Sequence, residues 1–423
     1  MKSKFSSWSI WAVSLCAAAC STVAVAQQPS SDTQRLFDQA MVRRSEGDID
    51  EAVKLLQAIL SSDPSLNRAR LELAVAYLQA LNFEAAKAEA EKVLRDPNTP
   101  QDVRVNVQNF LATVERERKP HVFTPFFNLG YMHDSNVNVG PAGSVFSAGG
   151  NTFNLVPGAI KQSDNAATLY GGLSHRYLAP KTYDVGGTAA TLLWQSQASL
   201  YHVGYNNLTA FDLDVLTFST GPALIAPRRW RANLGLQVDE IRIGHSRVAT
   251  YSAVNPNYTF IWGRTELALD GQIQRRDFKQ AVLSGRTSDY LMLSATLVHL
   301  FPGDKFALIG GMRGFDERAD VARFSNDGNE FFIGANWFPW KDGNVFVRFN
   351  ERTPKYKDVE PIFNIARDER ESRLILGFGH KFGSGFLKEW AFSGNYTQIK
   401  NHSNVPTFVY DRNQASLTLG RSF

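Results

Sequence analysis

Residues 168–175 read TLYGGLSH and residues 346–350 read FVRFN, and both stretches alternate apolar with polar side chains. A period of two places every second side chain on the same face of a β-strand. This pattern recurs from Pro120 to the end of the chain and predicts about fourteen strands. The predicted strands cover residues 122–133, 166–178, 188–205, 211–225, 229–244, 248–262, 264–278, 287–301, 304–317, 328–339, 343–353, 370–382, 388–400 and 410–423.

The connections between these strands alternate in length, apart from two short ones near Asn206 and His245. Short turns on the periplasmic side and longer loops outside are typical of outer-membrane barrels. An even strand number then leaves both ends of the chain in the periplasm. Short connections are predicted at residues 179–183, 227–228, 263, 302–303, 340–343 and 383–387, and longer ones at residues 135–165, 279–286, 316–327, 351–369 and 401–409.

A soluble β-sandwich is the alternative for this half of the chain. About 300 residues of continuous strands would make an oversized sandwich, and most of the predicted strands exceed the usual length in soluble proteins. A closed barrel leaves no free sheet edge and is the all-strand structure that lipid permits. Aromatic residues near strand ends suit two interfacial girdles. They are Phe126, Tyr131, Tyr177, Trp230, Trp262, Phe301, Trp337, Trp340 and Trp390.

The chain closes with an amphipathic strand at residues 410–423 that ends on Phe423. A terminal strand with a final Phe is similar to the signal that the barrel-assembly machinery reads. We therefore expect this machinery as a partner, with outer-membrane lipid around the finished barrel.

Residues 1–26 are predicted to be a secretory signal peptide, because a basic start precedes an apolar run and small residues end at Ala26. Lipidation at Cys20 is the alternative. Both cysteines, Cys16 and Cys20, lie in this segment, which fits passage through an oxidising periplasm without disulfides. The net charge of +4 is too small to indicate nucleic acid, and the mean hydropathy of −0.24 argues against a helical membrane protein.

Helical periodicity and an internal repeat mark residues 27–119 as a periplasmic TPR-like domain. Ala52 and Ala86 lie 34 residues apart, the TPR period, and Asp-Pro pairs end both repeats. Residues 102–118 are predicted to form a third, capping helix; a generic helical bundle is the alternative. A TPR stack presents a concave face to a protein partner. The predicted client-binding residues, some of which could be core, are Phe37, Met41, Arg44, Arg68, Leu71, Val75, Leu78 and Gln79.

No motif indicates catalysis, a cofactor or a metal. The stretch Asp134-Ser135-Asn136-Val137-Asn138 offers oxygen ligands, but no glycine-and-glutamate continuation follows, so a side-chain-to-backbone turn is favoured over calcium binding. The histidines show no metal spacing, although one could still meet a serine and an acid inside a lumen. Charged residues on inward faces are predicted to form a polar lumen: Arg242, Arg275, Arg313, Arg348, Arg373, Asp239, Glu266 and Glu371.

The signal peptide, short TPR domain and barrel of about fourteen strands together resemble the surface lipoprotein assembly modulator (Slam) family. The local match covers Gly130, Tyr131, Asp134, Ser135, Asn136 and Asn138 at the entry to the barrel, and the stretch 410–413 before the last strand is also similar. The resemblance implies an α+β multidomain protein of the type XI secretion route. It would export a client, either a surface lipoprotein or a secreted haem- or metal-acquisition protein, across the outer membrane. The N-terminal domain is short for the family, which leaves the choice of client open.

Three functions remain in competition. A protein translocon would capture its client through the TPR domain, with periplasmic chaperones as expected helpers. A polysaccharide exporter would also place TPR repeats before a barrel, but usually carries many more repeats. A passive porin-like channel has no need of a TPR domain. The sequence favours the translocon over an enzyme or either channel.

Overall fold

The computed structural model describes residues 31–423, and the predicted signal peptide, with Cys16 and Cys20, lies outside the described residues. Five helices come first, and none of the helices in the described part of the chain is long and apolar enough to cross a membrane. Asp48 and Asn82 cap two of them by accepting backbone hydrogen bonds from Glu51 and Ala85. The helices are α2 (Ser31–Glu46), α3 (Ile49–Ser62), α4 (Asn67–Gln79), α5 (Phe83–Arg95) and α6 (Gln101–Arg118).

The helices pack as successive antiparallel pairs around two cores. Ala52 and Ala86, one repeat apart, are fully buried, so the small side chains allow adjacent helices to approach closely. The first core contains Phe37, Ala40, Ile49, Leu56, Ile59, Ala69, Leu73 and Ala76. The second contains Ala74, Leu78, Ala86, Ala90, Val93, Val107, Phe110 and Val114.

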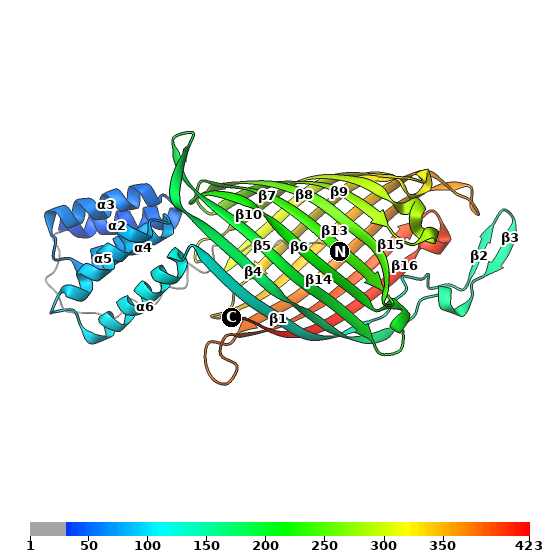
Figure 1. Ribbon diagram of the computed structural model, residues 1–423, viewed down its shortest axis with the longest axis horizontal. Coiled ribbons are helices and arrows are strands. Elements are labelled where there is room, and N and C mark those ends of the chain that lie inside the picture. Colours follow the sequence, from blue (N-terminus) through cyan, green and yellow to red (C-terminus); the bar gives the residue numbers. More distant parts are fainter. Residues whose placement is uncertain (1–30) are drawn as a thin grey trace.

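Fourteen antiparallel strands then close into a barrel in which the first strand pairs with both the second and the last. Figure 1 shows the helices at one end of this barrel. The predicted helical domain and fourteen-stranded barrel are therefore confirmed. The strands are β1 (His121–Asp134), β4 (Asp164–Val185), β5 (Thr188–Tyr205), β6 (Leu213–Ala226), β7 (Trp230–Ile243), β8 (Ser246–Trp262), β9 (Thr265–Phe278), β10 (Ser288–Leu300), β11 (Phe306–Ala319), β12 (Asn326–Trp337), β13 (Gly343–Glu360), β14 (Ile365–Lys381), β15 (Trp390–Ser403) and β16 (Tyr410–Ser422).

Two predicted connections are wrong because the strands run past the barrel rim. The turn predicted at residues 179–183 lies instead at Gly186 and Gly187, whose positive φ angles allow a tight hairpin. The long loop predicted at residues 351–369 is mostly strand, since β13 and β14 extend until a short turn at residues 361–364. Both extensions follow an irregularity in strand register, which resets the alternation that sequence reasoning relies on.

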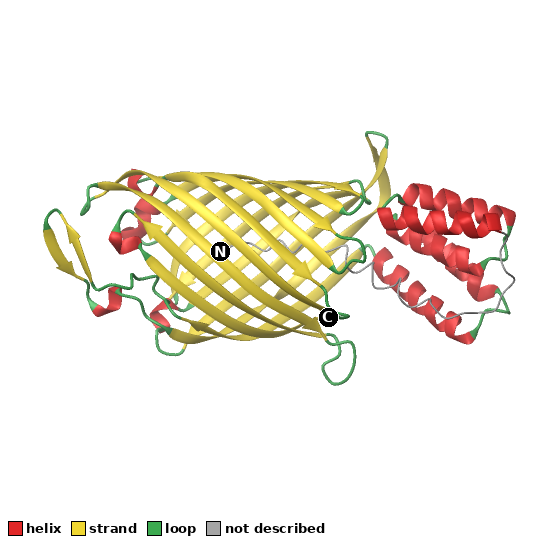
Figure 2. Cartoon of the chain, turned by 180° about the vertical axis from the view of Figure 1, so that it is seen from behind, coloured by secondary structure: helices red, strands yellow, loops and turns green. Residues whose placement is uncertain are grey.

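The connections at the end far from the helices are more elaborate. The first of them contains a separate hairpin, β2 (Val145–Ala148) and β3 (Asn151–Asn154), that projects beyond the barrel (Figures 1 and 2). Short 3-10 helices occur in the connections as well. They are η1 (Pro157–Ala159), η2 (Thr209–Phe211), η3 (Ala281–Arg286), η4 (Ala322–Phe324) and η5 (Pro406–Phe408).

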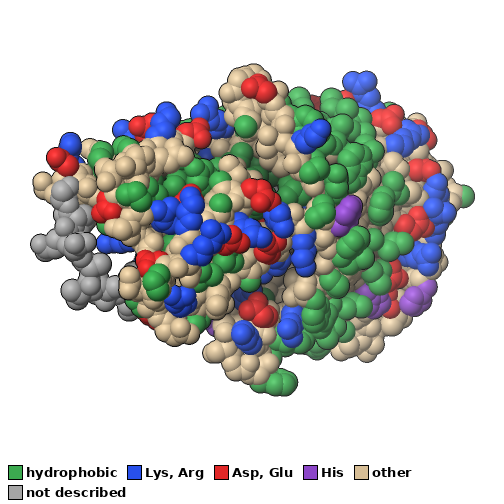
Figure 3. All heavy atoms as spheres, turned by 60° about the vertical axis from the view of Figure 1, so that its left-hand side comes forward, with side chains coloured by type: hydrophobic (Ala, Val, Ile, Leu, Met, Phe, Trp, Pro, Cys, Tyr) green, Lys and Arg blue, Asp and Glu red, His purple; other side chains and the backbone are tan. Residues whose placement is uncertain are grey.

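The outer wall of the barrel is apolar. Ile273, Leu293 and Ile333 are 61%, 64% and 62% exposed, and Figure 3 shows such side chains gathered in a band between charged regions. An apolar band of this extent requires a hydrocarbon environment. Tyr131 and Trp337 are exposed on this wall, as a girdle requires, whereas Phe126 lies on the inward face of β1 and packs on Tyr170.

Candidate functional site

The helical domain is joined to one end of the barrel through the turn between α2 and α3. Arg228, in the turn between β6 and β7, donates a hydrogen bond from Nε to the carbonyl oxygen of Gly47 over 3.2 Å. Gly47 has a φ of +93°, and a Cβ atom there would lie 2.6 Å from Arg228 Nη2. The positive φ therefore favours glycine at position 47, and a side chain there would displace the Arg228 guanidinium.

This contact is partly buried. Burial, together with the neighbouring Arg264 guanidinium, lowers the pKa of Arg228 below its ordinary value. A guanidinium that gives up hydration in this way depends on the acceptors that the protein supplies. The Gly47 carbonyl is one of these acceptors, so the helical domain supplies Arg228 with a hydrogen-bond partner.

Two ion pairs flank this contact. Arg229 Nη2 lies 2.9 Å from Asp50 Oδ2, and both side chains are exposed, so this pair contributes only about 0–1 kcal/mol. Arg176 on β4 makes a more enclosed contact with α6. Its Nη1 lies 3.0 Å from Glu117 Oε2, and its Nη2 donates to the carbonyl oxygen of Glu117 over 3.1 Å. The second contact therefore holds the domain more firmly than the first.

An apolar contact lies beside these polar ones. Phe83, the first residue of α5, packs against a buried cluster of Leu178, Leu193 and Ala223 at the same end of the barrel. Leu193 precedes outward-facing Trp194 on β5, so it belongs to the inner wall. One helix of the repeat domain thus contacts the lumen side of the barrel mouth. We call the contacts of Gly47, Asp50, Phe83 and Glu117 with the barrel the domain junction.

The predicted client-binding residues fall into two groups. Phe37 and Leu78 are buried in the helical cores and are therefore not available to a partner. Sequence position alone cannot separate a core residue from its accessible neighbour one turn away. Met41, Leu71 and Val75 are half-buried and pack on the cores from outside.

Among the polar members of the predicted groove, Arg68 is exposed, whereas Arg44 and Gln79 are half-buried. Arg44 pairs with Glu72 of α4, and the exposed Arg68 guanidinium lies 4.7 Å from the centroid of the Phe37 ring. The Oε1 atom of Gln79 is buried without a hydrogen-bond partner among the described residues. Of these three side chains, Arg68 is the one that is open to a partner.

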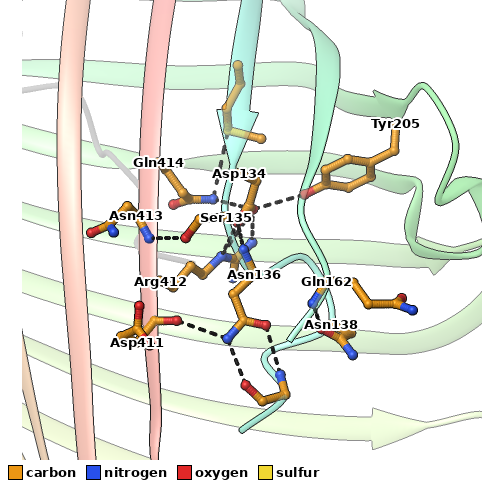
Figure 4. A network of polar contacts seen from close by, with 12 residues as sticks. Asp134, Ser135, Asn136, Asn138, Gln162, Tyr205, Asp411, Arg412, Asn413 and Gln414 are labelled. Carbon is orange, nitrogen blue, oxygen red and sulfur yellow. Dashed lines mark hydrogen bonds and ion pairs between the residues drawn. The ribbon is translucent and has the colours of Figure 1, made fainter. Parts of the chain in front are cut away.

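A second cluster of polar contacts closes the barrel between its first and last strands (Figure 4). Asp134, fully buried at the end of β1, accepts bonds at 3.0 Å from Arg412 Nε to both carboxylate oxygens and at 2.9 Å from Gln414 Nε2. Tyr205 of β5 donates a further bond over 3.2 Å. The carboxylate is thus neutralised by one guanidinium and fully bonded, as a buried charge must be.

The residues after Asp134 extend the same network. The Asn136 amide nitrogen donates to Asp134 Oδ1 over 3.0 Å, which is the side-chain-to-backbone turn expected from the sequence. Ser135 exchanges two bonds with the backbone of Asn413, and Asn136 Nδ2 reaches the Asp411 carbonyl over 2.9 Å. Within residues 31–423, no cluster of three His, Cys, Asp or Glu side chains is suited to a metal.

The two local stretches of the predicted family resemblance therefore contact each other, although about 275 residues separate them. Asn138 adds bonds to the carbonyl oxygens of Gly158 and Ile160 and so ties down the first long loop. Gly130 leaves no room for a side chain, because a Cβ atom would lie 2.5 Å from Thr168 Oγ1. These contacts indicate that residues 130–138 help to hold the barrel closed.

At the opposite end of this seam, Phe423 follows the last strand. Its amide donates to the Pro125 carbonyl over 2.9 Å, and its ring stacks on Phe127 with centroids 5.9 Å apart. The ring is 61% exposed.

Six of the eight charged residues predicted to face the lumen do so. Arg242 and Arg275 face outward instead. Arg275 shares its strand face with Ile273 and pairs with Asp289 over 3.1 Å, and Arg242 is exposed on the same face of β7 as Val238. Near the rim an outward charge meets water or lipid headgroups, so polarity there does not indicate the lumen. The inward residues are Arg313, Arg348, Arg373, Asp239, Glu266 and Glu371.

The histidine with the clearest acidic partner also lies outside the lumen. His202 Nδ1 lies 2.7 Å from Asp214 Oδ1, and the alternation of β5 and β6 places both on the outward face with Leu200 and Leu216. This hydrogen-bonded pair therefore lies on the outer surface of two neighbouring strands.

Comparison with known proteins found a repeat family, a curated relative and solved barrels that are similar to this chain. A tetratricopeptide repeat family model matches residues 43–104. The surface lipoprotein assembly modifier of Pasteurella multocida (strain Pm70) is 34% identical over 103 residues, which is 24% of this chain and only 19% of that relative. This chain thus spans about one fifth of the length of the curated relative.

Solved barrels align with low similarity. Pseudomonas aeruginosa OpdK with vanillate has 12% identity and a TM-score of 0.37, covering 71% of this chain and 98% of that one. Acinetobacter baumannii OccAB1 has 8% identity and a TM-score of 0.40, covering 72% and 97%. Vibrio cholerae OmpT without loop L8 has 8% identity and a TM-score of 0.41, covering 72% and 100%.

The similarity to the Pasteurella protein confirms the resemblance that the sequence predicts. The helical part carries a TPR match, and the barrel is closed and apolar outside, as in the outer membrane. The chain is thus a TPR-bearing outer-membrane barrel similar to a surface lipoprotein assembly modifier.

Proposed function

We propose that this protein is an outer-membrane translocon. Its TPR domain captures a client in the periplasm, and the barrel moves that client across the membrane. The client would be a surface lipoprotein or a secreted haem- or metal-acquisition protein. The name of the Pasteurella relative supports this role, as does the presence of a protein-binding repeat beside a barrel.

The domain junction is the observation that carries the proposal. A tethered domain that moved freely would only raise the local concentration of a client. Here Gly47 and Glu117 are hydrogen-bonded to barrel arginines, and Phe83 contacts the inner wall. A client held by the repeats is therefore held next to the entrance of the lumen.

The orientation follows from the loops. The helices and the shorter turns lie at one end of the barrel, and the β2–β3 hairpin and the 3-10 helices lie at the other (Figure 2). Outer-membrane barrels carry their longer loops outside. This supports a periplasmic TPR domain.

Further partners complete the proposal. Met41, Arg44, Arg68, Leu71, Val75 and Gln79 are the proposed client contacts. Phe423 is the proposed signal for the barrel-assembly machinery, and periplasmic chaperones would deliver the client. Lipid surrounds the apolar wall.

Surface display of a client tests the function. The candidate client is the product of a neighbouring gene, and its exposure is measured by protease treatment of intact cells. We expect display with the wild type and none after deletion. The junction variant Phe83→Ser with Arg228→Ala should reduce display, whereas the matched variant Val105→Ser with Arg95→Ala, at exposed helix positions, should not.

The same cells separate the alternatives. Unchanged surface display of the client after deletion would contradict the translocon function. Loss of surface polysaccharide in the deletion strain would instead indicate a polysaccharide exporter. Steady conductance in planar bilayers, without any effect of deletion on client or polysaccharide, would indicate a passive channel.

A further inference from the structure

The inner wall formed by β11–β14 is unusually rich in arginine. The strand register places Arg313, Glu330, Arg352 and Glu371 opposite one another in a single row. The next row toward the helical domain adds Arg373, which pairs with Asn350, and Arg348 follows two residues further along β13. Four arginines thus face two glutamates on neighbouring strands, which leaves a surplus of two positive charges.

The two surplus charges are identifiable. Arg313 Nη1 lies 3.0 Å from Glu330 Oε2, and Arg373 Nη2 lies 2.8 Å from Glu371 Oε1. Arg348 and Arg352 have no hydrogen bond or ion pair with any residue between positions 31 and 423. Within the described part of the chain, the Arg352 guanidinium makes a cation–π contact, 4.1 Å from the centroid of the Phe315 ring.

Donor atoms without acceptors gather in the same place. The Nε atoms of Arg313, Arg352 and Arg373 are buried and lack partners among the described residues. Buried polar atoms are almost always bonded in folded proteins, so three unpaired donors on β11, β13 and β14 indicate a missing acceptor. Arg313 and Arg352 are two strands apart, about 10 Å, which is within common reach of two long side chains.

The Arg348 side chain lies on the inner face of the wall. Arg348 faces Gly334 on β12, a position without a side chain. Its neighbours Val347 and Phe349 are exposed on the outer wall, so the alternation of β13 directs Arg348 inward.

Arg367, on the neighbouring strand β14, is an example of an arginine with a structural role in this barrel. Arg367 pairs with both Glu360 and Glu369 and lies between the rings of Tyr356 and Phe408, at 3.7 and 3.9 Å from their centroids. Arg348 and Arg352 form no such ion pair with a carboxylate of the described residues. Their charge is not used to hold the barrel together.

We propose that Arg348 and Arg352, with the free Nε donors of Arg313 and Arg373, form a luminal binding site for an anionic group, a carboxylate or a phosphate. Guanidinium groups suit both because they offer paired donors in one plane. The site does not depend on the translocon function. It would hold an acidic side chain in transit or a free anion equally well.

Arginine-selective modification with phenylglyoxal tests the site on the purified full chain. Peptide mapping by mass spectrometry should show that Arg348 and Arg352 react, and that inorganic phosphate slows their reaction. At ten times its dissociation constant, phosphate should slow modification about tenfold. Arg318, which is exposed on the outer rim beside Asp316, should react at the same rate with or without phosphate.

A second readout uses thermal unfolding. Phosphate or acetate should raise the melting temperature of the wild type but not that of Arg348→Gln with Arg352→Gln. The matched outward variant, Arg275→Gln with Arg318→Gln, should keep the shift. The use of both anions distinguishes a carboxylate site from a phosphate site. Arginines that fail to react, or that react without protection by phosphate, would overturn the proposal.

Discussion

Arg228 Nε donates a hydrogen bond to the carbonyl oxygen of Gly47 across 181 residues of sequence. This bond joins a turn of the repeat domain to a turn of the barrel. It occurs where glycine has a positive φ and where the guanidinium leaves no space for a side chain. A glycine that the TPR turn needs therefore also serves the attachment of the domain.

Gly47→Ala should loosen this attachment. The substitution introduces a strained φ, at about 1–2 kcal/mol, and a clash with the Arg228 guanidinium. Hydrogen–deuterium exchange should rise in α2, α3 and the β6–β7 turn, with little change in the remaining strands. Gly158→Ala, where a Cβ atom meets nothing within 4 Å, should leave exchange unchanged. Equal protection in both variants would count against the assigned role of Gly47.

Asp134→Ala should destabilise the closure of the barrel. It leaves the Arg412 guanidinium without its partner in a buried site, a change that costs about 3–5 kcal/mol. The temperature at which the folded barrel loses its fast migration on gels should fall. Asp316→Ala breaks the rim pair with Arg318, whose side chain is 83% exposed, and should cost under about 1 kcal/mol. A similar fall for both variants would contradict the account of the seam.

Phe83→Ser should free the helical domain from the barrel mouth. Phe83 is partly buried, so loss of its contacts costs less than the roughly 1.5–3 kcal/mol of a fully buried Phe. This cost is shared between the junction and the helical core that Phe83 also touches. Limited proteolysis should cut between α6 and β1 faster than in the wild type. Val105→Ser, at an exposed position of α6, should not change the cleavage rate. If cleavage is unaffected by Phe83→Ser, the apolar contact does not hold the domain.

Acidification should destabilise the helical domain. The Asn98 amide and the Asn67 side chain hold the pKa of Asp96 below its ordinary value, and the Ser65 hydroxyl and amide do the same for Asp63. Carboxyls with lowered pKa values contribute stability above their unfolded pKa, near 4, and lose it as pH falls through the folded values. Exchange protection of α3–α5 should therefore fall below about pH 4. Asp96→Asn should flatten part of this dependence.

Local pattern was enough to predict the fold. The fourteen strands and the 34-residue offset between Ala52 and Ala86 depend on repeats that the chain shows within each segment. The hairpin of β4 and β5 was placed too early because the register shifts after Leu178 and the alternation is lost. The predicted inward orientation of Arg275 was also wrong, because a charged side chain near the rim is stable on either face of the sheet.

The junction and the seam could not be predicted from one sequence. The partners Asp134 and Arg412 lie 278 residues apart, and nothing in either neighbourhood specifies the other. The surplus of arginine on the inner wall likewise depends on the register of four strands. Only the closed barrel brings these side chains together.

Site-specific photo-crosslinking during export tests the central claim most directly. A crosslinking residue is placed at Met41 in the proposed groove, at Asn255 on the inner wall and, as control, at Leu293 on the lipid-facing wall. We expect crosslinks to the client from Met41 and Asn255 but not from Leu293. A client that reaches the cell surface without any crosslink from Asn255 would contradict passage through the barrel.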